Sequence, residues 1–509
     1  MRSNTKWILA LAIIKFLLPY LLQSNYYEPQ RDEFLYLAEG RHLAWGYMEV
    51  PPMLSIFAWL TDFFGGSIFW IKFWPNLFGA FTFILIAKMI DHLGGKWFAI
   101  LLALFPFVFS GWLRMFFLFQ PNAPEIFFDT LMVYGVFRFV QTSKDKWLYV
   151  IGIAIGLGLL SKYTVAFWTV SLLLGLCLFN ARSVLANKHF YFSLLLAAFI
   201  FLPNFLWQYQ HNFPVFFHMN ELKETQLQYV SVLGFFSGQF LMYLPVFFVW
   251  IAGLIALIFV FQFRKFRSFA VAFIIYQLLM ILFQGKDYYT AGTFTVLFAF
   301  GAYWLEQLTG GKKKWLRPAM IVFSCGLGII LWPILLPVAK PASLSNYYEM
   351  ISLKKTGGLR WEDHKDHPLP QDFADMLAWK EMTEKTEKAY GRLSENEKKS
   401  SVIWCDNYGQ AGAFNFYKGH AFPESYSSNA SFLFWLPDIS EVENFVVITK
   451  DIHEEITGQF QTTIVADSIT NKYAVEYGTK ILILKKPSSA FRSYFMNELS
   501  MLKKRFGVK

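Results

Sequence analysis

Residues 7–22 read Trp-Ile-Leu-Ala-Leu-Ala-Ile-Ile-Lys-Phe-Leu-Leu-Pro-Tyr-Leu-Leu, and residues 31–36 read Arg-Asp-Glu-Phe-Leu-Tyr. The first stretch is apolar and follows basic residues, which is typical of a membrane-spanning helix or of a signal peptide. No small-x-small cleavage site follows it, so we expect an uncleaved first span. Carboxylates beside a bilayer are costly to desolvate, so the acidic pair in the second stretch indicates a functional use.

The composition of the whole chain is that of a membrane protein. Of its 509 residues, 55% are hydrophobic, 20% are aromatic and only 16% are charged, and the mean hydropathy is +0.36. Soluble proteins carry about 25% charged residues. The net charge of +10 is spread in short clusters between apolar runs, which argues against nucleic-acid binding and favours topology signals. The three cysteines show neither pairing nor metal-ligand spacing, so no disulfide framework is expected.

Apolar runs recur along the first two thirds of the chain. Because a span needs about 20 mostly apolar residues, we expect about eleven spanning helices. They are predicted at residues 7–22, 67–90, 97–113, 124–140, 147–160, 164–180, 190–207, 240–262, 268–284, 290–306 and 316–338. Alternate loops carry the basic residues Arg2, Lys6, Lys88, Lys96, Arg138, Lys144, Lys146, Arg182, Lys188, Arg264, Lys265, Arg267, Lys312, Lys313, Lys314 and Arg317. The positive-inside rule then predicts a cytoplasmic N-terminus and a C-terminal part on the outer side of the membrane.

The predicted fold class is a polytopic α-helical membrane protein at residues 1–339 with an extracytoplasmic α/β domain at residues 340–509. Within a first outer loop at 23–66, residues 51–64 are apolar but too short to span, which favours a helix lying in the membrane interface. In the C-terminal part, residues 402–404, 445–448 and 480–484 read as short buried strands. Residues 371–391 have helical periodicity.

Asp32 and Glu33 are the first candidate site residues. Neighbours on a helix point about 100° apart, so both acids cannot easily address one atom, and Asp32 would share a face with Tyr36 and Glu39. Asp32 is either a general base or an acid placed at the favourable end of a helix dipole. The spacing leaves both interpretations open.

Cations and tyrosines gather in the other loops that are predicted to lie outside. Residues 286–289 read Lys-Asp-Tyr-Tyr, which suits phosphate binding by an ammonium group and phenols, or an aromatic belt with a snorkelling lysine. Lys162 and Arg114 lie outside against the topology rule, and the same two interpretations apply to them. Glu125 and Asp129 lie four residues apart on one helix face and would need such a cation if buried. Three histidines are scattered, which does not indicate a metal site, although a divalent metal stays open: His42, His211 and His218.

Several segments occur in an order that carries a resemblance. They are Asp32-Glu33 followed by Tyr47-Met48-Glu49-Val50-Pro51-Pro52, then Gln120-Pro121-Asn122-Ala123-Pro124-Glu125, then Gly156-Leu157-Gly158-Leu159-Leu160-Ser161-Lys162-Tyr163-Thr164, then Gly285-Lys286-Asp287-Tyr288-Tyr289, and in the tail Asp406-Asn407-Tyr408-Gly409-Gln410-Ala411-Gly412-Ala413. This layout resembles the C-type membrane glycosyltransferases (GT-C), specifically the bacterial dolichyl-phosphate-mannose-protein mannosyltransferase-like family. The lipid A aminoarabinose transferases look like more distant cousins.

The resemblance implies transfer of a sugar from a polyprenyl-phosphate donor to a lipid, glycan or protein acceptor, at a site among membrane lipids on the outer face. Asp32 would be the catalytic base, with Glu33 as a second catalytic candidate. The donor phosphate would meet Lys286, Tyr288, Tyr289, Lys162 and Arg114. The acceptor or the site itself would be supported by Glu49, Asn122, Glu125 and Tyr36. Because polyprenyl phosphate is a good leaving group, an inverting displacement needs no obligatory metal.

Two positions depart from the family pattern. Many relatives have His where this chain has Val50, and Asp where it has Asn122; Glu125 or Glu49 would then supply the carboxylate. Two other kinds of function are weighed against the transferase: a membrane transporter or flippase of lipid-linked glycans, and a non-catalytic envelope assembly protein. A transporter would favour charges at the bilayer midplane and internal repeats, and the sequence shows no repeat.

Overall fold

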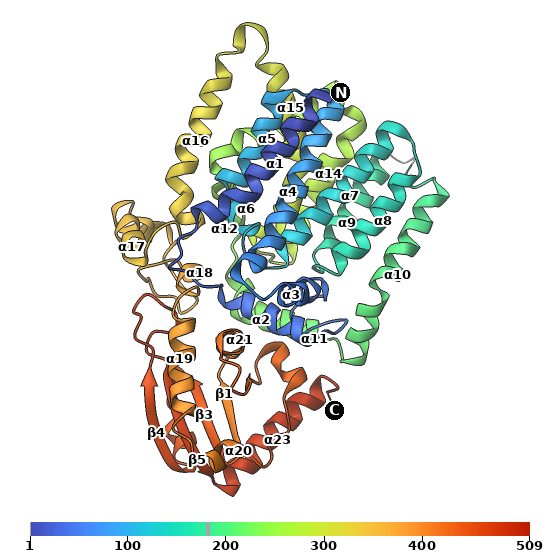
Figure 1. The fold of residues 1–509 in the computed structure, drawn as a ribbon. Helices are drawn as coiled ribbons and strands as arrows, with labels where there is room; N and C mark the ends of the chain where they lie inside the picture. The colour runs from blue at the N-terminus through green and yellow to red at the C-terminus, as the bar shows by residue number, and fades with distance from the viewer. Residues whose placement is uncertain (1, 180–183, 509) are drawn as a thin grey trace.

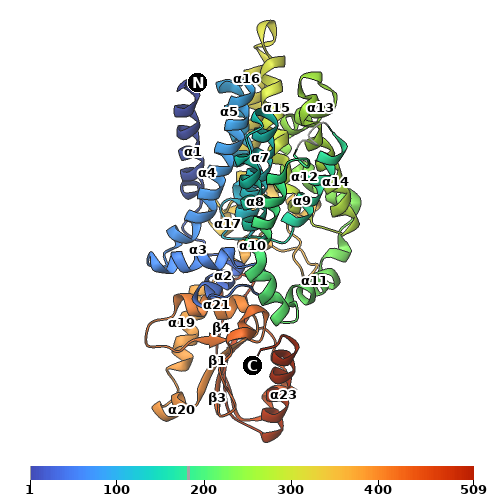
Figure 2. The same cartoon turned by 90° about the vertical axis from the view of Figure 1, so that its right-hand side faces the viewer.

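The computed structural model describes residues 2–179 and 184–508, so Arg182, one of the predicted topology signals, lies outside the described residues. Long helices form a bundle, and a mixed α/β unit covers one end of it (Figure 1; Figure 2). The N-terminus lies at the opposite end of the bundle from that unit (Figure 1). This arrangement confirms the predicted helical membrane-protein fold with a C-terminal α/β unit, while the side of the membrane on which that unit lies stays a prediction.

Each predicted span overlaps at least one helix. The bundle contains α1 (Arg2–Leu22), α4 (Ile68–Leu93), α5 (Trp97–Phe109), α6 (Trp112–Met115), α7 (Asn122–Thr142), α8 (Lys146–Leu159), α9 (Val165–Leu178), α10 (Lys188–Gln210), α12 (Val232–Met242), α13 (Phe247–Phe259), α14 (Arg267–Leu282), α15 (Phe294–Leu308) and α16 (Leu316–Leu335). The run at 97–113 breaks after Phe109, and the run at 240–262 bends by 65° between Met242 of α12 and Leu244, where η3 (Leu244–Val246) begins. Pro245 lies at that bend and cannot donate a helical hydrogen bond.

The number of spans stays a prediction. Within the described ranges, five helices are long and apolar enough to cross a membrane, and a sixth is gained if the bent pair counts as one span. Four apolar helices are shorter, namely Met53–Phe63, Trp97–Phe109, Lys146–Leu159 and Val165–Leu178.

Two short helices lie across the end of the bundle that faces the α/β unit: α2 (Arg31–Arg41) and α3 (Met53–Phe63) (Figure 1; Figure 2). They pack closely, since a Cβ on Gly40 of α2 would lie 2.5 Å from the Cβ of Ala58 on α3. Helix α3 buries Ala58 and exposes Trp59 and Phe63 at 46% and 71%. An amphipathic helix therefore forms at residues 51–64, as the apolar pattern predicted.

The C-terminal unit is built around a five-stranded sheet in the order β2-β1-β3-β5-β4. Its elements are α17 (Pro341–Met350), α18 (Gln371–Ala374), α19 (Trp379–Tyr390), α20 (Glu395–Lys399), β1 (Ser401–Cys405), α21 (Tyr408–Tyr417), β2 (Ser425–Tyr426), η8 (Ala430–Trp435), β3 (Asn444–Thr449), α22 (Glu454–Thr457), β4 (Phe460–Ser468), β5 (Lys480–Pro487) and α23 (Ser489–Arg505). Strands β2, β1 and β3 are parallel, whereas β5 is antiparallel to β3 and β4.

The three predicted strands are present as β1, β3 and β5, while β2 and β4 were not foreseen. Strand β4 has no apolar pattern by which it could be predicted, because most of its residues are exposed. The helix predicted at 371–391 is two helices, because the chain turns at Ala378 with φ of 71° before the buried Trp379.

Candidate functional site

Asp32 lies in the first turn of α2, at the seam between the bundle and the C-terminal unit. The helix begins with a capping box. The Gln30 side chain accepts a hydrogen bond from the backbone N–H of Asp32 at 2.9 Å, and the backbone N–H of Gln30 donates to the Glu33 side chain at 2.8 Å. The Tyr408 hydroxyl, from α21 of the C-terminal unit, donates to Asp32 Oδ1 at 2.7 Å. Gln120 approaches Oδ2 at 3.4 Å. A carboxylate at the positive end of a helix is thus reached from two other segments of the chain.

Glu33 points the other way, into the bundle. Its side chain is fully buried, and both carboxylate oxygens lie 2.6 Å from Lys72 Nζ on α4. The Phe119 amide also donates to it, at 2.6 Å. The geometry therefore makes Glu33 an ion-pair partner inside the fold, and it gives the expected catalytic role of Glu33 no support.

Lys162 lies between carboxylate and aromatic groups. Its ammonium donates to Asn122 Oδ1 at 2.7 Å and to Glu125 Oε2 at 2.9 Å. It also lies 4.4 Å from the ring centroid of Tyr289. Thr164 donates to the other oxygen of Glu125. The predicted pairing of Glu125 with a cation is thus present, and the structure selects Lys162 as that cation.

Lys286 lies beside the same tyrosines. The Tyr288 ring centroid is 5.9 Å from Lys286 Nζ and 5.6 Å from Lys162 Nζ, so one phenol links the two lysines. Lys286 also donates to Gln226, whose amide donates to Glu362 at 3.2 Å. Burial lowers the pKa of Lys286, and the positive charge of Lys162 lowers it further, while Glu362 and Asp32 oppose the shift. The charges of Lys162 and Asp32 thus both act on Lys286, and Tyr288 lies beside both lysines.

Arg114 is bound by protein groups. Its guanidinium donates to Asp372 at 2.5 Å and to the backbone oxygens of Ile334 and Leu335 at 2.8 and 3.1 Å. It also lies 4.9 Å from the ring centroid of Phe373. Arg114 therefore ties the bundle to the segment around α18, which leaves its expected role in phosphate binding without support from the geometry.

Glu49 and Tyr36 lie on the tail-facing side of the first loop. Glu49 accepts from the Ser431 amide at 3.0 Å and from the Ser431 hydroxyl at 2.5 Å, so it anchors η8 of the C-terminal unit. Burial raises the pKa of Glu49 to about 7. Tyr36 is nearly buried, and burial, reinforced by Asp32 and Glu39, raises its pKa. The face shared by Asp32, Tyr36 and Glu39 was correctly anticipated from helix spacing.

The histidines do not come together. His42 stacks on Trp435, and His211 stacks on Trp207. His218 lies near Lys286, and burial together with that lysine lowers its pKa to about 4. Among the described residues, no three His, Cys, Asp or Glu side chains are placed to hold a metal ion.

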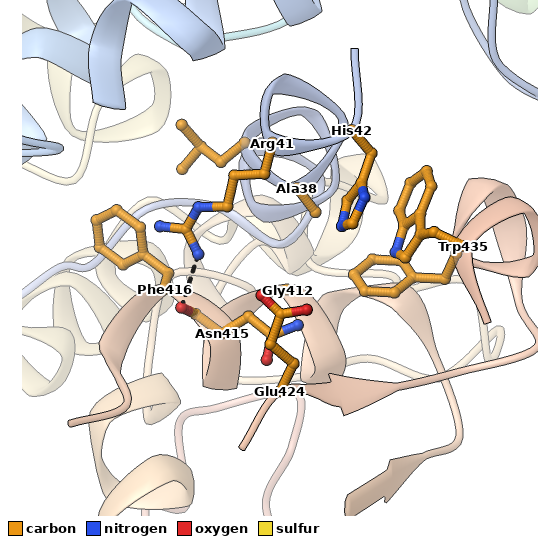
Figure 3. Close-up of a pocket in the computed structure, with 10 residues that line it drawn as sticks. Ala38, Arg41, His42, Gly412, Asn415, Phe416, Glu424 and Trp435 are labelled. Carbon is orange, nitrogen blue, oxygen red and sulfur yellow. Dashed lines mark hydrogen bonds between the residues drawn. The ribbon is translucent and has the colours of Figure 1, made fainter. Parts of the chain in front are cut away.

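A narrow crevice marks the seam on the other side of α2. Figure 3 shows Arg41 at the end of α2, and His42 directly after it, facing Asn415 and Trp435 of the C-terminal unit. Arg41 donates to the Asn415 backbone oxygen at 2.9 Å and to Asp62 at 2.8 Å. Arg41 thus ties the end of α2 both to α3 and to α21 of the C-terminal unit.

The sequence interpretation left three contributors without a role. Tyr408 and Gln120 both lay inside segments that resemble the family, and that likeness was the available signal. Lys72 lies in an apolar run, where a buried lysine is itself a signal for a carboxylate partner.

Comparisons with known proteins agree with this architecture. Residues 49–207 match the protein family described as dolichyl-phosphate-mannose-protein mannosyltransferase. The structure of ArnT from Cupriavidus metallidurans bound to undecaprenyl phosphate superposes with a TM-score of 0.59 over 95% of this chain and 98% of ArnT, at 10% identity. Its apo form gives a TM-score of 0.60 over 94% and 98%, at 12% identity.

This chain therefore has the fold of ArnT, and about a third of it matches the mannosyltransferase family. A further relative, the lipid A galacturonosyltransferase RgtD of Rhizobium johnstonii, is 24% identical over 225 residues, which are 41% of this chain. Those residues span 45% of RgtD, less than half its length. The family match includes Glu49, Asn122, Glu125 and Lys162, whereas Asp32 precedes it. The resemblance seen in the sequence is confirmed.

Proposed function

We propose that this GT-C chain transfers a sugar from a polyprenyl-phosphate donor to a lipid, glycan or protein acceptor at the outer face of a bacterial inner membrane. The observation that carries the proposal is the grouping of Asp32 with Lys162 and Lys286 around Tyr288, at the end of the bundle that the C-terminal unit covers. A base and two cations are the groups that displacement of a phosphate from a sugar requires. The fold shared with ArnT, which was solved with undecaprenyl phosphate, supports the donor class.

The reaction is a direct displacement at the anomeric carbon. The acceptor oxygen forms a bond to that carbon as its bond to the phosphate oxygen breaks, and the electron pair departs with the polyprenyl phosphate. Asp32 takes the proton of the acceptor hydroxyl. Lys286 and Lys162 stabilise the negative charge on the departing phosphate, and Tyr288 and Tyr289 donate hydrogen bonds to it. Attack opposite the leaving group inverts the anomeric configuration.

Glu125 supplies the carboxylate that relatives carry at the position of Asn122. Both side chains contact Lys162 Nζ, at 2.9 and 2.7 Å, so a carboxylate at either position would pair with this lysine. Glu125 and Asn122 together orient the Lys162 ammonium toward the two tyrosines that are expected to flank the donor phosphate.

The proposal is tested by offering labelled donors to membranes that contain the chain or the variant Asp32→Asn. The panel holds undecaprenyl-phosphate sugars and the matching nucleotide sugars. We expect label to reach an acceptor only from the lipid-linked donors, and only with the unmodified chain. Transfer only from nucleotide sugars, or no transfer from any donor in native membranes, would contradict the proposed donor class. Equal transfer by both chains would remove Asp32 from the mechanism.

A further inference from the structure

The C-terminal unit supplies one side chain to the candidate site. Tyr408 is the first residue of α21, and Asn407 caps that helix by accepting from the Gln410 amide at 3.0 Å. The Tyr408 hydroxyl donates to Asp32 Oδ1 at 2.7 Å across a separation of 376 residues. A hydrogen bond from a phenol to a carboxylate is short and strong when it is buried.

Two glycines bring α21 against α2. A Cβ on Gly409 would lie 2.4 Å from Arg31 Cγ, and a Cβ on Gly412 would lie 2.8 Å from the Phe34 backbone oxygen. They lie three residues apart and so share one face of α21. The approach that places Tyr408 over Asp32 therefore depends on small residues at both positions.

The contacts of Asp32 differ between its two oxygens. Oδ1 receives the Tyr408 hydroxyl, and Arg31 Nε lies 3.5 Å from it. The Arg31 guanidinium also lies 5.7 Å from the ring centroid of Tyr408. Among the described residues, Oδ2 has only the long contact of 3.4 Å with Gln120. One oxygen is held firmly and the other weakly, in a side chain that is 28% exposed.

We infer that Tyr408 is a positioning residue for the transfer: it fixes Oδ1 of Asp32 so that Oδ2 takes the proton of the acceptor. The inference rests on the proposed function, and it assigns to the C-terminal unit a direct part in the chemistry of the bundle. Tyr408 does not touch the reacting atoms. It acts by restricting the carboxylate to one orientation.

The phenol is suited to this part because it stays a donor. Burial raises the pKa of Tyr408 well above its usual value, and the neighbouring Asp32 raises it further. Ionisable groups from several elements act on the same carboxylate or on Tyr408: Arg31, Tyr36, Tyr288, Lys286 and Asp375. None of these groups replaces the hydrogen bond from Tyr408 among the described residues.

The test compares Tyr408→Phe with Tyr417→Phe. Tyr417 ends the same helix, and its buried hydroxyl has no hydrogen-bond partner in the described part of the chain. Tyr417→Phe therefore removes a phenolic oxygen, as Tyr408→Phe does, but breaks no hydrogen bond. We expect Tyr408→Phe to lower kcat about 10- to 100-fold, the usual effect of losing a hydrogen bond to a charged group. KM for the lipid-linked donor and the melting temperature should stay unchanged. A fall in kcat per folded protein, at an unchanged KM and an unchanged melting temperature, is a result that a merely structural defect would not produce.

The variant Asp32→Asn distinguishes a failure of the inference on Tyr408 from a failure of the proposed function. If it is inactive while Tyr408→Phe keeps the unmodified kcat, the inference on Tyr408 is overturned and the proposed function stands. If Asp32→Asn is as active as the unmodified chain, the proposed mechanism fails, and the role of Tyr408 fails with it. A loss of kcat in Tyr417→Phe equal to that in Tyr408→Phe would also overturn the inference.

Discussion

Glu33→Gln is predicted to destabilise the fold without touching the chemistry directly. Glu33 is 0% exposed and Lys72 1%, and Lys72 Nζ lies 2.6 Å from both carboxylate oxygens. The substitution removes the only carboxylate that pairs with this ammonium among the described residues. Its other close neighbour is the Phe117 ring, 4.6 Å away. Breaking a buried ion pair by removing one partner costs about 3–5 kcal/mol, because the remaining charge stays buried and uncompensated.

The assay is thermal unfolding of the purified protein in detergent. At about 2–4 °C per kcal/mol for a large domain, the melting temperature should fall by about 6–20 °C. Adding Lys72→Met removes the orphaned ammonium, so Glu33→Gln/Lys72→Met should recover most of the loss. Glu384→Gln on the exposed side of α19 serves as the control and should melt like the unmodified chain.

Two results would refute this reasoning. One is a Glu33→Gln variant that melts with the unmodified chain yet has lost transfer, which would return Glu33 to the chemistry. The other is a double variant no more stable than Glu33→Gln, which would show that the buried ammonium is not the source of the cost.

Two further predictions concern carboxylates at the seam. Glu125→Gln should lower the initial rate of label transfer about 10- to 100-fold, because Lys162 loses a charged hydrogen-bond partner. Adding Asn122→Asp to this variant should restore most of the rate. Burial raises the pKa of Glu49 from 4.5 to about 7, so the docked state holds a proton that the undocked state releases. Docking of the C-terminal unit through Ser431 should therefore weaken as pH rises from about 4.5 to about 7 and level off above it. Limited proteolysis across this range measures docking, and Glu49→Gln should flatten the dependence.

Clear opposite outcomes exist for both predictions. An Asn122→Asp/Glu125→Gln variant as slow as Glu125→Gln would show that the two positions are not interchangeable. Docking that strengthens between pH 4.5 and 7, or that keeps its pH dependence in Glu49→Gln, would show that another group sets the pH dependence of docking.

The membrane architecture was largely predictable because apolar runs have a simple cause. Hydrocarbon selects long apolar segments, and each predicted span contains a helix. The breaks were not predictable from hydropathy: the run at 97–113 stops at Ser110, and the run at 240–262 bends at Pro245. Hydropathy scores the side chains, whereas these breaks depend on backbone hydrogen bonding and local packing.

The candidate site was predictable only in part. Helix geometry showed that Asp32 and Glu33 diverge, but it could not say which of them faces the bundle, because that depends on Lys72, 39 residues away. The contact between Asp32 and Tyr408 joins residues that are 376 apart and follows from how the C-terminal unit docks. The expectation that Arg114 binds the donor phosphate did not include its partner Asp372, which lies 258 residues further along the chain. Long-range partners of this kind leave no local pattern.

The most direct test of the central claim is the rate of sugar transfer from undecaprenyl-phosphate donors by equal amounts of folded, purified protein with and without Asp32→Asn. The account predicts an inverted product from the unmodified chain and a rate about 10²- to 10⁴-fold lower in the variant, the usual contribution of a general base. A variant that transfers sugar at the unmodified rate, or a product with retained configuration, would contradict it.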